Sequence, residues 1–153
     1  MRKWLLPVTA IVTLALLTGC ETTTGTSGLG EGRGALTRGD FDPFGGDRAP
    51  VDLHYFTAPR DGRYRVTLTS GSGDNPLRNP VIWVLRGRVR DNRNDFLRAY
   101  RDGRGVVAEA TGQSIATLGF GGTGGDTFTL VFTSRRNDLG TYDYLIERGG
   151  GQN

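Results

Sequence analysis

The chain has 153 residues, enough for one domain of ordinary size, and its 19 Lys and Arg residues against 16 Asp and Glu give a formal net charge of +3. This small excess does not fit a nucleic-acid binder, which carries a large basic surplus on one face. One histidine and one cysteine also leave too few ligands for a zinc site, which uses several His or Cys side chains.

The first 19 residues have the order of a secretory signal peptide. A basic start, "RK", precedes an apolar stretch over residues 5–17, which is too short for a membrane span of about 20 apolar residues. The sequence "LTGC" at residues 17–20 resembles the lipobox of bacterial lipoproteins, in which the peptide is cut before the cysteine. The resemblance implies that Cys20, the only cysteine, carries acyl chains that anchor the protein to a membrane.

A lipidated Cys20 predicts a location in the cell envelope. In Gram-negative lipoproteins an Asp after the cysteine usually marks retention at the inner membrane, but residue 21 here is Glu. The resemblance therefore implies an outer-membrane protein that faces the periplasm. One acyl chain anchors a protein only marginally, whereas two or three hold it stably.

The segment that follows, residues 20–49, has the composition of a flexible tether, because Gly, Thr and Ser dominate and large apolar side chains are scarce. Phe41 and Phe44 are exceptions that could dock onto the next domain. Residues 50–148 form the expected domain, and residues 149–153, "GGGQN", form a tail that we expect to be disordered.

Short runs with alternating or continuous apolar residues fill the expected domain. The strand candidates are "VDLHYFTA", "RYRVTLTS", "VIWVLRGR", "VVAEA", "SIATLGF", "TFTLVFTS" and "TYDYLIE". The segment "VRDNRNDFLRAYRDGRG" is ambiguous, because Phe96, Leu97 and Tyr100 have helical spacing while a short strand fits equally well. About seven or eight short strands predict an all-β fold, an antiparallel jelly-roll-like β-sandwich.

From about Val51 to Glu147 the layout resembles the bacterial pre-peptidase C-terminal (PPC) domain. "HYFTAPRDGRYRVTLTS" is similar to the opening hairpin of that family, "NPVIWVLRGR" to its Asp-Pro and apolar strand, and "GGDTFTLVFTSRRNDLGTYDYLIE" to its closing hairpin. The resemblance implies a jelly-roll-like sandwich of the kind attached to secreted peptidases and other exported proteins. Some members bind calcium, but Asn79 stands where an Asp is common, and the sequence shows no peptidase domain.

His54 is the only histidine that a Ser-His-Asp or Cys-His arrangement could use. Its strand position, on one face with Asp52 and Phe56, is typical of a structural histidine with a hydrogen bond or solvent contact. Acidic residues fall mostly in turns, and only Glu109 has apolar neighbours in the sequence. The sequence therefore predicts a protein that is not an enzyme, and a glycosidase with a carboxylate pair is the weakest alternative.

Gly119, Gly121 and Gly124 match the pattern G-x-G-x-x-G. A dinucleotide site needs a helix after this motif, so that the helix N-terminus faces the pyrophosphate. A strand-like segment, "DTFTLVF", follows instead. The pattern therefore predicts a glycine-rich hairpin loop.

Asp91 and Asp95 stand with two Asn residues in the segment "DNRND", and their oxygens could supply part of a calcium site. Arg93 occupies the third position of an EF-hand loop, and Phe96 occupies its Gly position. The pattern favours a turn capped by Asx side chains. We therefore expect no cofactor, with calcium as the alternative.

Arginines concentrate between residues 86 and 104. They are Arg86, Arg88, Arg90, Arg93, Arg98, Arg101 and Arg104. The first three alternate and would share one face if the strand continued through them. With Arg93 they are the candidate ligand-binding residues, because guanidinium groups make two-point contacts with carboxylates and phosphates. A solvated edge strand whose charges prevent aggregation is the alternative.

Together these features predict a non-catalytic envelope protein that acts as a binding or scaffolding module. Its expected partners are the membrane, through the lipid, and an envelope protein or anionic glycan, through the arginines; nucleic acid is not expected. The alternative is an accessory structural domain that stabilises or positions a partner exported protein.

Overall fold

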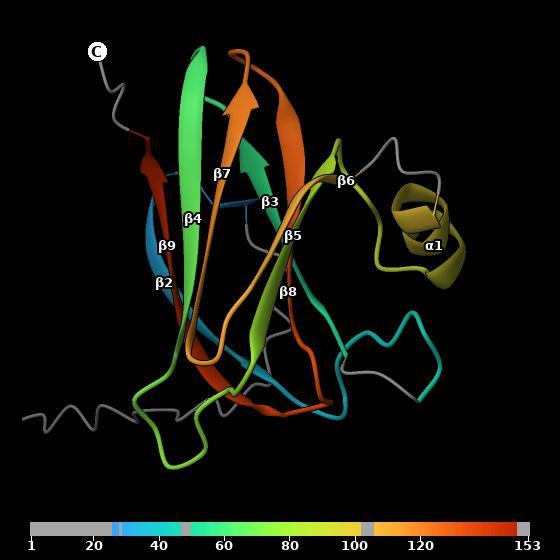
Figure 1. Ribbon diagram of the computed structural model, residues 1–153. Coiled ribbons are helices and arrows are strands. Elements are labelled where there is room, and N and C mark those ends of the chain that lie inside the picture. Colours follow the sequence, from blue (N-terminus) through green and yellow to red (C-terminus); the bar gives the residue numbers. More distant parts are fainter. Residues whose placement is uncertain (1–25, 28, 47–49, 102–105, 150–153) are drawn as a thin grey trace, which may run out of the picture.

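A computed structural model describes residues 26–27, 29–46, 50–101 and 106–149, with backbone alone for residues 26–27 and 106–109. Two sheets stack face to face, and a helix lies beside them (Figure 1). The first sheet contains, in spatial order, β1 (Thr26–Ser27), β3 (Asp52–Thr57), β8 (Thr127–Ser134), β5 (Pro80–Arg86) and β6 (Val106–Thr111). The second sheet contains β2 (Gly30–Leu36), β9 (Gly140–Arg148), β4 (Gly62–Ser70) and β7 (Ile115–Gly122).

The pairings are antiparallel except for β1, which pairs with β3 in parallel. The predicted antiparallel β-sandwich is confirmed. Alternation explains the core between the sheets: in β4, Tyr64, Val66 and Leu68 are buried, while Arg63 and Arg65 are exposed. Burial of such apolar side chains, at about 25 cal/mol per Å², is the main force that holds the two sheets together.

A second apolar cluster lies on the outer face of the first sheet, where Trp83 of β5 faces the helix α1 (Arg93–Arg101). Phe96 of α1 is fully buried there, so the ambiguous segment is a helix. Phe44 packs edge-on against both, with ring centroids 6.1 Å from Trp83 and 5.8 Å from Phe96. Phe41 lies 5.7 Å from Phe96, which confirms that the two phenylalanines dock onto the domain.

Asn92 and Asp95 form the N-terminal cap of α1. The backbone N–H of Asp95 donates to Asn92 Oδ1 (2.9 Å), and Asn92 Nδ2 donates to Asp95 Oδ2 (2.8 Å). Such a cap satisfies N–H groups that the first helical turn leaves unpaired. The predicted turn capped by Asx side chains is confirmed, and it begins a helix.

Strand β2 corrects the expected extent of the tether, because Gly30–Leu36 pairs with β9 along its whole length. Gly32 lies opposite Tyr144 and Gly34 opposite Tyr142, and a Cβ at either glycine would overlap the facing phenol ring. Glycine is therefore needed so that the two tyrosines can lie across β2, an arrangement in which aromatic rings cover glycine backbone. Composition alone suggested a linker because these small residues carry no apolar signal.

Replacing Gly34 with alanine tests this packing. The new methyl group would meet the Tyr142 hydroxyl, and overpacking of this kind typically costs about 1–3 kcal/mol. We expect Gly34→Ala to lower the free energy of unfolding by that amount in a urea titration. Gly119→Ala in β7 is the matched control, because its methyl group meets only the Tyr64 carbonyl at 3.8 Å. Equal stabilities of the two variants would contradict the proposed role of Gly34.

Candidate functional site

The arginines do not share one strand face. Strand β5 ends at Arg86, and Gly87, with φ of 81°, turns the chain out of the sheet. A left-handed backbone of this kind favours glycine. Arg88 and Arg90 therefore lie on a loop, whereas Arg93 begins α1.

Four hydrogen bonds fasten this loop to buried parts of the sandwich. Gly87 donates its N–H to the Thr127 carbonyl (2.7 Å), and its own carbonyl accepts from the Thr129 hydroxyl (2.8 Å). The same Thr129 oxygen accepts from the N–H of Val89 (2.9 Å), whose carbonyl accepts from the Tyr55 hydroxyl (2.9 Å). Thr129 is fully buried and Tyr55 nearly so. The loop is thus held by the core although it lies at the surface.

Arg88, Arg90, Asp91 and Tyr55 line a hollow of about 510 Å³, the arginine hollow. The Arg88 guanidinium lies 4.3 Å from the centre of the Tyr55 ring. A cation–π contact of this kind contributes about 0.5–1 kcal/mol at an exposed site. Because the Tyr55 hydroxyl is fixed by Val89, the ring is a rigid base for the guanidinium.

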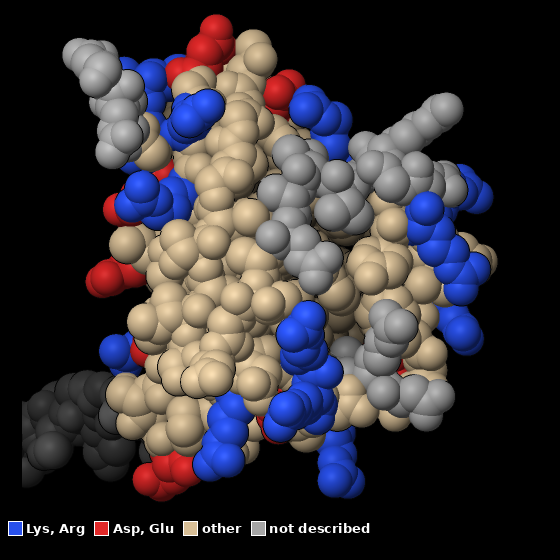
Figure 2. All heavy atoms as spheres, in the orientation of Figure 1, with Lys and Arg blue, Asp and Glu red and all other residues tan. Residues whose placement is uncertain are grey.

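The charges around the arginine hollow are unbalanced. Ion pairs within the described residues join Arg33 to Asp143, Arg65 to Glu147 and Arg86 to Asp126. Arg88 and Arg90 form none with the described residues, and neither do Arg98 and Arg101 on α1. The last two are three residues apart, so they share a helix face. Basic side chains lie along the side of the molecule that carries α1 (Figure 2).

The predicted ligand-binding residues thus have different surroundings. Arg88 and Arg90 meet in the hollow. Arg86 pairs with Asp126 at 3.7 Å and lies 5.8 Å from the centre of the Phe128 ring. Arg93 faces Asp42: burial tends to raise the pKa of Asp42, but N–H donors from residues 44–46 and the Arg93 charge lower it on balance.

The two carboxylates named as calcium candidates lie in different surroundings. Asp95 is engaged in the cap of α1, and Asp91 lies in the arginine hollow. Among the described residues, no group of three or more His, Cys, Asp or Glu side chains could hold a metal ion. Cys20, Arg104 and the Glu109 side chain lie outside what the structure describes, and no helix in the described ranges is long and apolar enough to cross a membrane.

The glycine motif is a connection between sheets. Gly119 and Gly121 belong to β7 of the second sheet, Gly124 lies in the turn, and β8 of the first sheet follows. A strand rather than a helix follows the motif, as predicted. The predicted hairpin is wrong, however, because β7 and β8 pair with different neighbours.

A buried polar network joins the sheets at His54, which is 5% exposed. The Tyr142 hydroxyl donates to Asp52 Oδ2 (2.5 Å) and lies 3.2 Å from His54 Nε2. Because the Tyr142 proton is directed at Asp52, His54 Nε2 must be the donor to Tyr142. The histidine ring also packs against Phe132 and Tyr144, with centroids 4.7 and 4.9 Å away. The predicted structural histidine is confirmed, but no sequence signal named Tyr142 as its partner.

Burial sets the protonation of this network. It lowers the pKa of His54 to about 4, so the imidazole is neutral at pH 7. Burial also raises the pKa of Asp52, although the hydrogen bond from Tyr142 acts in the opposite direction. The pKa of Tyr142 is raised by burial and by the nearby Asp52 charge, so the phenol keeps its proton.

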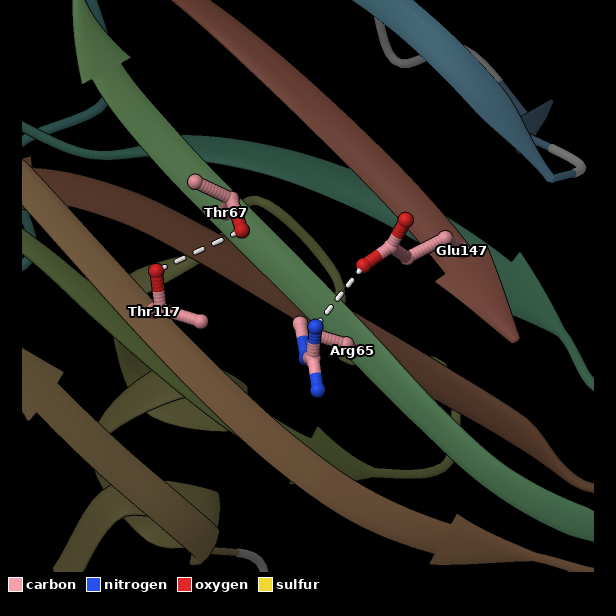
Figure 3. Close-up of polar contacts among 4 residues, drawn as sticks. All are labelled: Arg65, Thr67, Thr117 and Glu147. Carbon is pink, nitrogen blue, oxygen red and sulfur yellow. Dashed lines mark hydrogen bonds and ion pairs between the residues drawn. The ribbon is translucent and has the colours of Figure 1, made fainter. Parts of the chain in front are cut away.

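The second sheet presents a different surface on its outer face. Arg65 Nη1 contacts Glu147 Oε1 at 3.2 Å, and the Thr67 and Thr117 hydroxyls lie 3.4 Å apart (Figure 3). Arg33 and Asp143 form a second ion pair at 2.8 Å beside a hollow of about 410 Å³. Arg33 and Arg65 thus have carboxylate partners, unlike Arg88 and Arg90.

Several solved structures resemble this chain in part. No family model matches the chain, and no curated protein is similar to it in sequence. The pre-peptidase C-terminal domain of a Bacillus anthracis collagenase is 15% identical, with 80% of this chain and 92% of that chain covered and a TM-score of 0.48. The surface-associated copper-binding protein CorA of Methylomicrobium album BG8 is 7% identical, with coverage of 81% and 98% and a TM-score of 0.49. A CBM35 from Cellvibrio japonicus is 12% identical, with coverage of 80% and 92% and a TM-score of 0.36. These similarities concern the fold alone.

The neutral His54 predicts a loss of stability in acid. The unfolded imidazole takes up a proton near pH 6.5, whereas the folded one does so near pH 4, so the unfolded chain binds more protons between these values. The free energy of unfolding should fall over this range by as much as about 3 kcal/mol, at about 1.4 kcal/mol per pKa unit. The raised pKa of Asp52 partly offsets this loss, since the folded chain takes up that proton first.

Urea titrations at pH 7 and pH 4.5 measure the effect. His54→Gln should show a smaller difference between the two pH values than the unchanged chain, and Asp52→Asn a larger one. The test compares the difference in free energy of unfolding between the two pH values, so it is informative even if either variant is less stable overall. An unchanged pH dependence in His54→Gln would contradict this assignment.

Proposed function

We propose that the chain is a lipid-anchored envelope protein whose sandwich binds an anionic cell-wall glycan through the arginine hollow. One observation carries the proposal: Arg88 and Arg90, which have no carboxylate partner among the described residues, lie on a loop whose backbone is held by hydrogen bonds to the core. The anchor rests on the lipobox resemblance at Cys20. No chemical step is assigned to the site, which acts by binding.

The chemistry of the hollow favours an oxyanion. Guanidinium groups are weakly hydrated and offer paired donors that match carboxylates and phosphates. Because the loop is already ordered, little conformational entropy is lost when a ligand binds. Asp91 offsets part of the positive charge, which favours a ligand that makes two-point contacts over one held by charge alone.

The membrane anchor would keep this site near the lipid surface. Five residues separate Cys20 from Thr26, where β1 begins. Even a fully extended chain of this length spans no more than about 22 Å, at 3.3–3.6 Å per residue. The glycan would therefore be contacted close to the membrane rather than at a distance.

Co-sedimentation with purified cell-wall sacculi tests the proposal. Residues 21–153, which retain every described element, are mixed with sacculi of the source organism and spun at low and high salt. The unchanged chain should bind at low salt and lose much of its binding at high salt, because exposed charges are screened. Arg88→Gln with Arg90→Gln should weaken binding at least tenfold, since even one hydrogen bond to a charged group contributes about 1.5–3 kcal/mol.

A matched control removes two charges elsewhere. Arg135 and Arg136 are exposed just after β8. They lie near Pro80, at the start of β5, whereas the arginine hollow follows Arg86, at the other end of that strand. Arg135→Gln with Arg136→Gln should bind within about twofold of the unchanged chain. An equal loss in both double variants would show a general charge effect and contradict a specific site. Absence of binding at either salt would remove the glycan and favour a partner protein, which is the accessory-domain alternative.

A further inference from the structure

Strand β7 lies at an edge of the second sheet and has neither a charged residue nor a proline to protect that edge. Its eight residues, "IATLGFGG", contain no charge and no proline. Its register with β4 runs from Gly62–Gly122 to Thr69–Ile115 without a bulge. An uncharged, regular edge strand is a template for pairing with another strand.

The other edges are protected. Strand β2 exposes Glu31 and Arg33, and β1 has only two residues. Strand β6 contains Glu109, and its ladder with β5 shifts register between Val84 and Leu85. Charges, short strands and bulges are the means by which sheets avoid unwanted pairing. Strand β7 is therefore the exception among the edges that the structure describes.

The backbone of β7 shows which of its N–H and C=O groups could pair with a further strand. Ser70 donates its N–H to the Ser114 carbonyl at 2.8 Å, so even-numbered residues from 114 onward point their N–H and C=O groups at β4. The odd-numbered residues Thr117, Gly119 and Gly121 point theirs away from β4. In the described part of the chain no other strand pairs with them.

We propose that β7 pairs with β7 of a second copy of the chain, antiparallel and two-fold symmetric, with Leu118 on the axis. This register places odd-numbered residues opposite each other, as the free backbone groups require. Thr117 then lies opposite Gly119 of the second copy, and the reverse pair follows by symmetry. Each such pair exchanges two hydrogen bonds, about four in all.

The side chains of β7 complement each other in this register. On the outer face Ile115, which is 56% exposed, lies opposite Gly121 of the second copy, where there is no side chain. On the inner face the small Ala116 lies opposite Phe120 of the second copy. Large residues thus meet small ones at each paired position beside the axis, and no like charges meet. This self-complementarity identifies a second copy as the occupant.

Local geometry defines the extent of the backbone pairing. A Cβ on Gly112 would overlap the Ile115 carbonyl, so the loop after β6 lies against that end of the strand. We therefore assign hydrogen bonds to Thr117 and Gly119, and only side-chain packing to Ile115. Arg63 of β4 lies beside Gly121 in the ladder, and its aliphatic stem would flank Ile115 of the second copy.

An interface of one strand pair is small, so we expect a weak dimer in solution. Stable interfaces usually bury more than about 1,000 Å². On a membrane the anchor would hold copies at a high effective concentration, and weak pairing would then be populated. The dimer is argued from β7 alone and does not rest on the arginine hollow.

Sedimentation velocity over a concentration series tests the dimer with residues 21–153. The unchanged chain should shift from monomer to dimer as its concentration rises. Thr117→Lys, which puts a charge on the edge, and Gly119→Pro, which removes an outward N–H and no hydrogen bond to β4, should remain monomeric. Thr67→Lys is the matched control, because Thr67 lies on the same outer face but one strand inward. It should dimerise like the unchanged chain.

A mixing experiment tests the register. Thr117→Lys and Gly119→Glu should each be monomeric alone and should form a heterodimer when mixed, because the two new charges lie opposite each other. A mixture of Thr117→Lys and Ile115→Glu should form much less heterodimer, because positions 117 and 115 do not lie opposite each other in this register. A chain that stays monomeric at every concentration, or equal behaviour of Thr117→Lys and Thr67→Lys, would overturn the proposal. Neither result depends on glycan binding, so the two proposals fail separately.

Discussion

The structure depends on the burial of β5 and β8 on both of their faces. These strands lie side by side in the first sheet, and the second sheet covers only one face of them. Trp83 and Val131 point the other way and would meet water if nothing covered them. The helix α1 and the segment with Phe41 and Phe44 provide that cover. A helix in an otherwise all-β protein is thus a consequence of two central strands with apolar side chains on both sides.

The arginine hollow depends on the same core. Thr129 of β8 is fully buried, and its hydroxyl joins Gly87 to Val89 across the turn that leaves β5. The Tyr55 hydroxyl of β3 donates to the Val89 carbonyl, and the Tyr55 ring lies under the Arg88 guanidinium. The surface groups therefore take their positions from two interior side chains of neighbouring strands. A core substitution at Thr129 would disturb the hollow without touching an arginine.

Alternating apolar side chains made the sandwich predictable from the sequence. Strand β2 was missed because the residues on its inner face include glycines, which have no side chain. In β4 and β9 large apolar residues at every second position identify the inner face. In β2 the same positions are Gly32 and Gly34, whose inner face is filled by tyrosines from β9. The spacing G-x-G-x-G-x-L was a usable signal, because glycine alternates there as apolar residues do elsewhere.

The arginine cluster was visible in the sequence. Which of its arginines have a carboxylate partner was not. Arg86 has a carboxylate partner from the distant Asp126, whereas Arg88 and Arg90 have none among the described residues. Such pairings arise from contacts between segments far apart in the chain, which spacing does not encode. The partner of His54 was hidden for the same reason, since Tyr142 lies 88 residues away.

The pairing of β2 with β9 also has a consequence for folding. Most of the domain lies between these two strands in sequence, so the second sheet cannot close until β9 is available. Pairings between distant segments form slowly, because a long loop must be closed before they are stabilised. A chain that emerges from the ribosome N-terminus first would therefore complete the second sheet last.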